Sequence, residues 1–331
     1  VLAGARAGGI YGDEFLWMKY QTLMTPPSYV HGIWVAIFLL HGLFVYASVF
    51  HKDLQHSNLV GYDLALSQQP KRSVAAHYPA VCATTLATIY AHDSGFVFCA
   101  FIFSLSCALF LASVIKVQGQ LLDETEAQAE SNINGYVKEG DGNNNSDNLN
   151  ASSLAVNDFG NIKSRAIQYI CLRLPFELHG GYILALVAMY FNTFLHSSFD
   201  SLPTMFYLVV ANASLLGLLF AGFMILWKIP GRKLYGAGAS LVWYLLGMAI
   251  ELHTPTQPIY NEYSDSAILT TQIVATVATT VLMIMLGVRV NKTMIKYNIF
   301  DCAGMFGGRE DNESVVSEDK DGGISANYVH A

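Results

Sequence analysis

The hydrophobic and polar positions of this chain alternate in long blocks, and seven of the blocks are apolar enough to predict membrane helices. An α-helix rises about 1.5 Å per residue, so about 20 apolar residues cross a hydrocarbon core of roughly 30 Å. The shortest block, Tyr78–His92, is either a crossing or a re-entrant segment. The seven predicted segments are Tyr29–Phe50, Tyr78–His92, Gly95–Val117, Ala166–His196, Leu202–Trp227, Leu234–Leu252 and Ala267–Val290.

The distribution of positive charge decides between these two alternatives and predicts the orientation. Lys and Arg concentrate in loops on the cytoplasmic face of a membrane, or on the stromal or matrix face of an organelle. With seven crossings, the face that holds the N-terminus carries only Arg6 and Lys19 of the chain's 18 cations. Without a crossing at Tyr78–His92, the basic groups on either side of it would face opposite ways. We therefore predict an all-α, polytopic bundle of seven transmembrane helices, with the N-terminus outside and the C-terminus inside.

The composition agrees with the membrane class. The chain of 331 residues is 53% hydrophobic and 13% charged, whereas soluble globular proteins carry about 25% charged residues. The net charge of −7 comes mostly from two polar segments, so no nucleic-acid partner is predicted. Membrane lipids are the expected surroundings.

The polar segments divide the chain into five parts. We expect an N-terminal segment at 1–28 with an interfacial helix, three helices at 29–117, an acidic loop at 118–165, four helices at 166–290 and a polar cytoplasmic or stromal tail at 291–331. The loop begins as a helical extension and becomes rich in Gly, Asn and Asp, a composition that predicts disorder. Because the chain begins at Val1, we expect that a targeting peptide has been removed. The plastid, the mitochondrion and the endomembranes all remain open as locations.

Ionisable side chains inside the predicted spans are the candidate site residues, because each costs several kcal/mol unless it is paired or lies in a cavity. Arg173 and Glu177 are four residues apart, so we expect an ion pair on one helix face. Glu177 and His179 point about 200° apart and cannot pair. His31 and His41 lie about 80° apart, so both can face the bundle without chelating one ion. They are either neutral hydrogen-bonded rings, axial ligands of a tetrapyrrole metal or proton carriers.

Sequence motifs of the common enzyme classes are missing. The chain has no G-x-S-x-G, H-E-x-x-H or Walker sequence. The last predicted span, Ala267–Val290, contains no Lys for a retinal Schiff base. The five cysteines fit neither a disulfide framework nor a zinc site. We predict a protein that is not an enzyme.

Two segments of the chain resemble the translocator/tryptophan-rich sensory protein (TspO) family. The sequence PPSYVHGIW at Pro26–Trp34 is similar to the start of that family's first helix, where a proline pair leads into W-V-F-G-x-x-W. The sequence LPFELHGGY at Leu174–Tyr182, followed by Asn192, is similar to its fourth helix. A short second helix paired with a third is also typical of the family. The chain departs from it in its few tryptophans, its acidic loop and its additional spans at the C-terminal end.

The resemblance implies a function. The family binds porphyrins, sterols and other flat apolar ligands between its helices. The resemblance therefore implies a hydrophobic small molecule as the partner. It also implies a tetrapyrrole such as haem or chlorophyll as the cofactor class. His31 or His179 would be the polar contact. The residues that it implies for a pocket are Tyr29, His31, Trp34, Pro175, Phe176, His179, Tyr182 and Asn192.

Two other classes of function stay open from the sequence. One is an accessory structural or pigment-binding subunit of a large photosynthetic or respiratory membrane complex, or a homo-oligomer. The other is a seven-helix transporter or receptor. Native gel migration would distinguish the first, and ligand-dependent flux in liposomes would distinguish the second.

Overall fold

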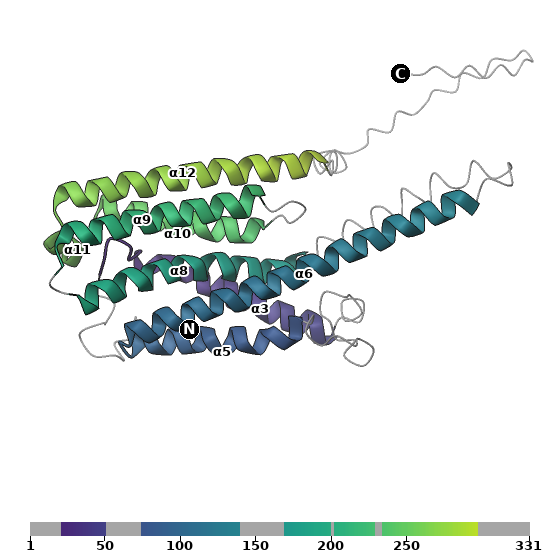
Figure 1. Ribbon diagram of the computed structural model, residues 1–331, viewed down its shortest axis with the longest axis horizontal. Coiled ribbons are helices and arrows are strands. Elements are labelled where there is room, and N and C mark those ends of the chain that lie inside the picture. Colours follow the sequence, from purple (N-terminus) through teal and green to yellow (C-terminus); the bar gives the residue numbers. More distant parts are fainter. Residues whose placement is uncertain (1–20, 51–73, 140–168, 200–201, 229–233, 297–331) are drawn as a thin grey trace, which may run out of the picture. The chain divides into compact units, whose positions relative to one another are not determined.

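The computed structural model describes residues 21–50, 74–139, 169–199, 202–228 and 234–296. These residues form helices and turns and contain no strand, which confirms the all-α class (Figure 1). The chain divides into two compact units, 1–289 and 290–331, and the second is described only through the end of α12. The elements are η1 (Ser28–Gly32), α3 (Ile33–Phe50), α5 (Val74–Asp93), α6 (Val97–Glu139), η4 (Tyr169–Arg173), α8 (Leu174–Ser198), α9 (Thr204–Phe223), η5 (Met224–Lys228), α10 (Tyr235–His253), α11 (Gln257–Glu262) and α12 (Asp265–Lys296).

Six helical segments of the described residues are long and apolar enough to cross a membrane, and each overlaps a predicted span. They are Ser28–Phe50, Val97–Gly119, Tyr169–Ser198, Thr204–Trp227, Tyr235–His253 and Asp265–Ile295. The helix α5 covers the prediction at Tyr78–His92 but is not among the six. It contains Thr84, Thr85 and Thr88, whose hydroxyls donate to carbonyls one turn earlier and so are satisfied within the helix.

The centre of the first unit is built on α8 and α10. Their apolar windows are 56% and 67% buried, against 22–28% for the other four candidate spans. The helix α8 packs against α3, α6, α9 and α10. A helix that is surrounded by others needs apolar residues on most of its faces, and α8 accordingly presents buried side chains at most positions from Pro175 to Asn192.

A glycine lets α8 and α10 approach closely. A Cβ added at Gly181 would lie 2.8 Å from Ala237 Cα and would also collide with Ser240 Oγ and the Ala237 carbonyl. Helices in lipid associate through close van der Waals packing rather than the hydrophobic effect, and small residues at a crossing permit that packing. Another glycine, Gly95, has φ of 80° and makes the turn that joins α5 to α6 as an antiparallel hairpin (Figure 1).

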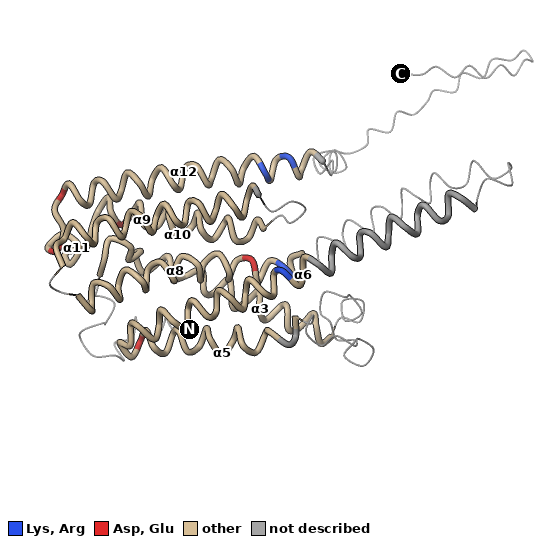
Figure 2. Tube along the Cα trace, in the orientation of Figure 1, with Lys and Arg blue, Asp and Glu red and all other residues tan. Residues whose placement is uncertain are grey.

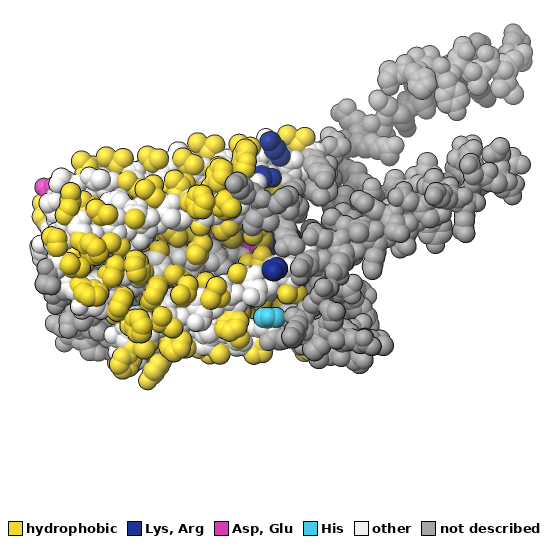
Figure 3. Space-filling model, in the orientation of Figure 1, with side chains coloured by type: hydrophobic (Ala, Val, Ile, Leu, Met, Phe, Trp, Pro, Cys, Tyr) yellow, Lys and Arg dark blue, Asp and Glu magenta, His cyan; other side chains and the backbone are white. Residues whose placement is uncertain are grey.

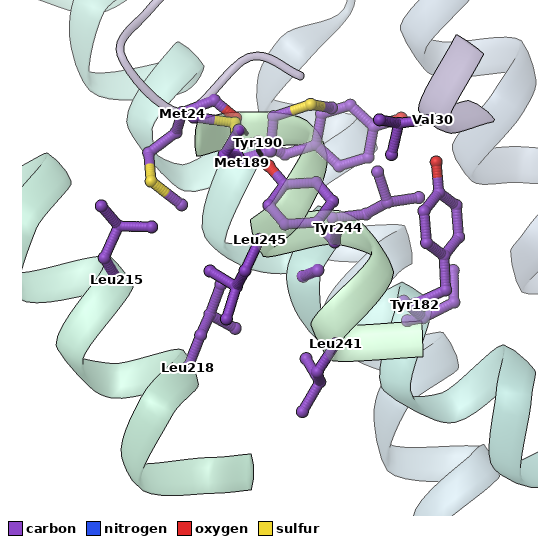
Figure 4. Packing of buried hydrophobic residues seen from close by; sticks show 14 of the residues in the cluster. Met24, Val30, Tyr182, Met189, Tyr190, Leu215, Leu218, Leu241, Tyr244 and Leu245 are labelled. Carbon is purple, nitrogen blue, oxygen red and sulfur yellow. Dashed lines mark hydrogen bonds between the residues drawn. The ribbon is translucent and has the colours of Figure 1, made fainter. Parts of the chain in front are cut away.

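The segment before η1 closes one end of the bundle over α10. The Tyr244 hydroxyl donates to the Met24 carbonyl at 2.6 Å, and the Trp243 indole donates to the Val30 carbonyl at 3.0 Å. Met24 and Tyr244 lie in the hydrophobic cluster together with Met189 and Leu215 (Figure 4). These contacts fix where the chain enters α3.

The charged residues of the first unit lie toward the two ends of its helices (Figure 2). Arg173 precedes α8 and Arg289 lies near the end of α12. The acidic residues Asp93, Glu251 and Asp265 lie at the helix ends of the opposite side. Between the ends, the face shown in Figure 3 is covered mainly by hydrophobic side chains. An apolar band between polar ends is the surface that a bilayer requires.

The helix α6 continues beyond the predicted span end at Val117 as far as Glu139. Its 43 residues include the expected helical extension of the acidic loop. The part of the loop for which disorder is predicted, residues 140–165, lies outside the described residues. Most of the predicted interfacial helix at 15–23 and nearly all of the tail at 291–331 also lie outside them.

Candidate functional site

Two buried histidines from different helices form a hydrogen-bonded pair. His41 Nε2 on α3 lies 3.1 Å from His179 Nδ1 on α8. His179 Nε2 lies 3.4 Å from Thr85 Oγ1 on α5, and that oxygen lies 3.3 Å from Cys107 Sγ on α6. His41 is 8% exposed and His179 is 2% exposed. We call His41, His179 and Thr85 the histidine chain, because they link three helices through polar contacts inside an apolar core.

Aromatic rings enclose the histidine chain. The Tyr78 ring stacks on His41 at 5.6 Å between centroids, and the Phe176 ring meets His41 edge-on at 5.2 Å. The Trp34 ring packs edge-on against His179 at 5.4 Å. An ionised imidazole would be costly in these surroundings, so the site offers hydrogen bonds from neutral rings rather than charge.

A second polar contact joins η1, directly before α3, to α8. The Tyr182 hydroxyl lies 2.7 Å from His31 Nδ1. The Trp34 ring also packs on the Tyr182 ring at 5.3 Å, so it touches both this contact and the histidine chain. Tyr182 is fully buried, whereas His31 and Trp34 are only partly buried. The α3–α8 contact therefore carries aromatic rings and imidazoles along one continuous strip.

The opposite side of α8 holds a different polar network around Glu177. The carboxylate, which is fully buried, forms an ion pair with Arg173 at 2.6 Å, as the sequence spacing predicted. Its Oε2 accepts from the Tyr169 hydroxyl and from the Gly236 backbone N–H, both at 3.0 Å. This Glu177 network ties α8 to α10. The prediction that Glu177 and His179 point away from each other is confirmed.

Proline shapes the start of α8. Pro175 lies in the first turn, where the missing backbone N–H costs little. The preceding turn, Tyr169–Arg173, is π-helical, as expected where a proline cannot donate to the carbonyl four residues earlier. This local break brings Tyr169 within reach of Glu177.

The structure separates the eight residues of the predicted pocket. Tyr29 is largely exposed and packs edge-on against Trp243 at 6.3 Å. Asn192 points toward α9, where its amide donates to Ser214 Oγ at 2.9 Å. Pro175 is a buried residue of the helix start. The residues that lie together along the α3–α8 strip are His31, Trp34, Phe176, His179 and Tyr182.

Sequence reasoning left two members of the histidine chain out of the predicted pocket. His41 was a candidate without a partner, because its separation of 138 positions from His179 leaves no periodic signal. Thr85 lies in the least hydrophobic of the predicted spans. Its position in a run of Thr within a membrane segment was the available signal.

The site does not resemble a metal centre. Among the described residues, no three side chains of His, Cys, Asp or Glu gather closely enough to hold a metal ion. A tetrapyrrole would meet aromatic rings for stacking, while the imidazoles of His31, His41 and His179 already contact other side chains.

Comparison with known proteins gives one match. A family model described as TSPO-like protein matches residues 14–288. No curated protein and no solved structure matches the chain significantly. The family match covers all the helices described above up to α12 and includes both polar networks of α8.

Proposed function

Because the chain belongs to the TSPO-like protein family, we propose that this integral membrane protein binds or moves a flat hydrophobic ligand inside its bundle. The ligand class is a tetrapyrrole, a sterol or a similar lipid, and no chemical step is assigned to the protein. The observation that carries the proposal is the position of Trp34, whose ring touches both His179 and Tyr182.

The chemistry of the α3–α8 strip supports this proposal. Ligand sites are lined mainly by apolar and aromatic groups, with a few polar atoms that set orientation. Along the strip, Trp34 and Phe176 supply apolar rings, while the hydrogen-bonded imidazoles of His31 and His179 supply polarity. Trp34 stacks on Phe38 at 5.4 Å, and Phe38 is 47% exposed. The strip therefore reaches the lipid-facing surface, from which an apolar ligand would enter.

Equilibrium titration of the purified protein in lipid nanodiscs tests the proposal. Haem, chlorophyllide and cholesterol are the probes, and we expect saturable binding of at least one of them. His31→Ala removes the partner of Tyr182 and should weaken binding by about tenfold, if one hydrogen bond and its ring packing are lost. His92→Ala at the end of α5 is the matched control and should bind normally. No saturable binding of any probe would reject the proposed function.

We further propose seven crossings with the N-terminus outside. The 20 residues of α5 span about 30 Å, and the helix runs antiparallel to the first part of α6, which contains the candidate span Val97–Gly119 (Figure 1). The start of α8, which Arg173 precedes, and the end of α12, near Arg289, lie at the same end of the first unit (Figure 1), which agrees with that end facing inward. Protease accessibility of tags on the two termini tests this, because protection of both termini on one side contradicts an odd number of crossings.

A further inference from the structure

One nitrogen of the histidine chain, Nδ1 of His41, has no hydrogen-bond partner among the described residues. The His41 side chain is only 8% exposed. Buried polar atoms are nearly always paired, so each unpaired one calls for an explanation. Here the atom belongs to a ring that Tyr78 and Phe176 flank, and it is the open end of a longer polar chain.

The proton positions of the chain follow from its other end. The Thr85 hydroxyl has a single proton, and it lies 2.7 Å from the Val81 carbonyl, to which it donates. A hydroxyl that has given its proton to a carbonyl can only accept from other groups. The His179 nitrogen that faces Thr85 at 3.4 Å must therefore carry a proton and donate.

This assignment fixes both histidine rings. A neutral imidazole has one N–H and one acceptor nitrogen. Because His179 is protonated at Nε2, its Nδ1 is an acceptor, and His41 Nε2 donates to it across 3.1 Å. The remaining nitrogen, His41 Nδ1, is then a hydrogen-bond acceptor. The acceptor character of His41 Nδ1 on α3 is therefore determined by groups on α5 and α8, namely the Val81 carbonyl, Thr85 and His179.

We propose that His41 Nδ1 accepts a hydrogen bond from the hydroxyl group of an otherwise apolar ligand. The inference rests on the proposed function and narrows its ligand class to apolar alcohols. A ketone or an ether would present oxygen lone pairs to the lone pair of Nδ1 and would leave the nitrogen unpaired. A carboxylate would bring an unpaired charge into the core, which is costlier still. The flanking rings of Tyr78 and Phe176 suit a hydrocarbon skeleton next to the hydroxyl.

The test compares ligands that differ only in the hydroxyl proton. Cholesterol and its 3-methyl ether form one pair, and geranylgeraniol and its methyl ether form the other. In nanodiscs, we expect one alcohol to bind the wild-type protein about five- to tenfold more tightly than its ether, the difference that one buried hydrogen bond makes. The alcohol-to-ether affinity ratio is the measured quantity.

A variant of His41 connects that ratio to the nitrogen. His41→Phe keeps a flat ring between Tyr78 and Phe176 but removes Nδ1, so the ratio should fall to about one while the ether still binds. His92→Phe makes the same chemical change at a partly buried histidine near the end of α5 and should leave the ratio unchanged. Retained ether binding shows that the variant is folded.

Each alternative outcome overturns the inference. Equal binding of alcohol and ether to the wild-type protein contradicts it, as does a ratio that His41→Phe leaves unchanged. If bound haem shows a Soret shift and His41→Phe abolishes it, His41 Nδ1 is a metal ligand and not a hydrogen-bond acceptor for an alcohol. If haem or chlorophyllide binds but neither pair does, this inference fails while the proposed function stands. If no probe binds, both fail.

Nuclear magnetic resonance provides a test that does not depend on a ligand. Nitrogen-15 shifts of the labelled protein should report the Nε2–H tautomer for both His41 and His179. Addition of the alcohol should move the resonance of His41 Nδ1, and addition of the ether should not. A proton found on His41 Nδ1 in the free protein contradicts the assigned polarity.

Discussion

The two sides of α8 differ in how completely their buried polar groups are paired. On the side of α10, Glu177 Oε2 accepts from the Tyr169 hydroxyl and the Gly236 N–H, while Oε1, which accepts no hydrogen bond from a described residue, lies 2.6 Å from the Arg173 guanidinium in an ion pair. On the side of α3, the histidine chain ends at His41 with an acceptor that no described residue pairs. The two networks begin only two residues apart, at Glu177 and His179.

The difference separates a structural role from a binding role. A buried network whose charged and polar atoms each face an ionic or hydrogen-bonding partner holds helices together and leaves no open atom for a ligand. A network with one open atom stabilises the fold less and leaves that atom for another molecule. The comparison therefore predicts that changes on the Glu177 side reduce stability, whereas changes on the histidine side alter ligand selectivity.

The largest expected effect comes from Glu177→Ala. This change leaves Arg173, Tyr169 and the Gly236 N–H without their shared partner inside the bundle. Removing one member of a buried ion pair costs about 3–5 kcal/mol of unfolding free energy. Thermal unfolding in nanodiscs measures the loss, and the alcohol-to-ether ratio of the protein that remains folded should not change.

A matched carboxylate on the surface is the control for this change. Glu262 lies 3.3 Å from His196 and its side chain is 51% exposed, so Glu262→Ala should cost less than about 1 kcal/mol. Equal losses for the two variants would mean that the Glu177 network does not hold α8 to α10.

Gly181→Ala should have an intermediate effect. The new methyl group would meet the backbone of Ala237, so α8 and α10 must move apart. Overpacking of this kind costs about 1–3 kcal/mol. Gly217→Ala on α9 is the control, since nothing lies within 4 Å of its added Cβ. It should unfold at or slightly above the wild-type temperature, because alanine favours a helix.

The smallest effect on stability, with the sharpest effect on selectivity, is expected from Thr85→Val. Valine keeps the shape but removes the oxygen that holds the proton of His179 on Nε2. Either nitrogen of His179, and therefore either nitrogen of His41, can then carry the proton. We expect a loss of about 1 kcal/mol or less and an alcohol-to-ether ratio that falls toward one. Thr84→Val removes a hydroxyl that donates to the carbonyls of Ala80 and Val81, and it should keep the ratio. If Thr84→Val lowers the alcohol-to-ether ratio and Thr85→Val does not, the histidine chain does not determine the selectivity.

The sequence predicted those features that depend on one helix at a time. Apolar length located the spans, and spacing predicted both the Arg173–Glu177 ion pair and the opposed directions of Glu177 and His179. These features follow from helix geometry, which is the same wherever the helix lies. The extension of α6 to Glu139 was also consistent with its polar helical composition.

The contacts between helices could not be predicted in this way. His41 and His179 are distant in sequence, and no pattern in either span tells which helices become neighbours. The role of the Gly236 N–H as a donor to Glu177 likewise depends on the crossing of α8 and α10. Of the pocket residues that the family resemblance implies, His31, Trp34 and His179 lie along one strip, whereas the Asn192 side chain faces α9.

The length of α6 has a consequence outside the bilayer. The helix continues for 20 residues beyond its candidate span, which ends at Gly119, to Glu139, a distance of about 30 Å. Electrostatic screening at physiological salt acts over about 8 Å. A helix of this length along the membrane normal would hold its end at Glu139 beyond the electrostatic reach of the lipid headgroups. A soluble partner that binds there would meet the chain at a distance from the membrane charge.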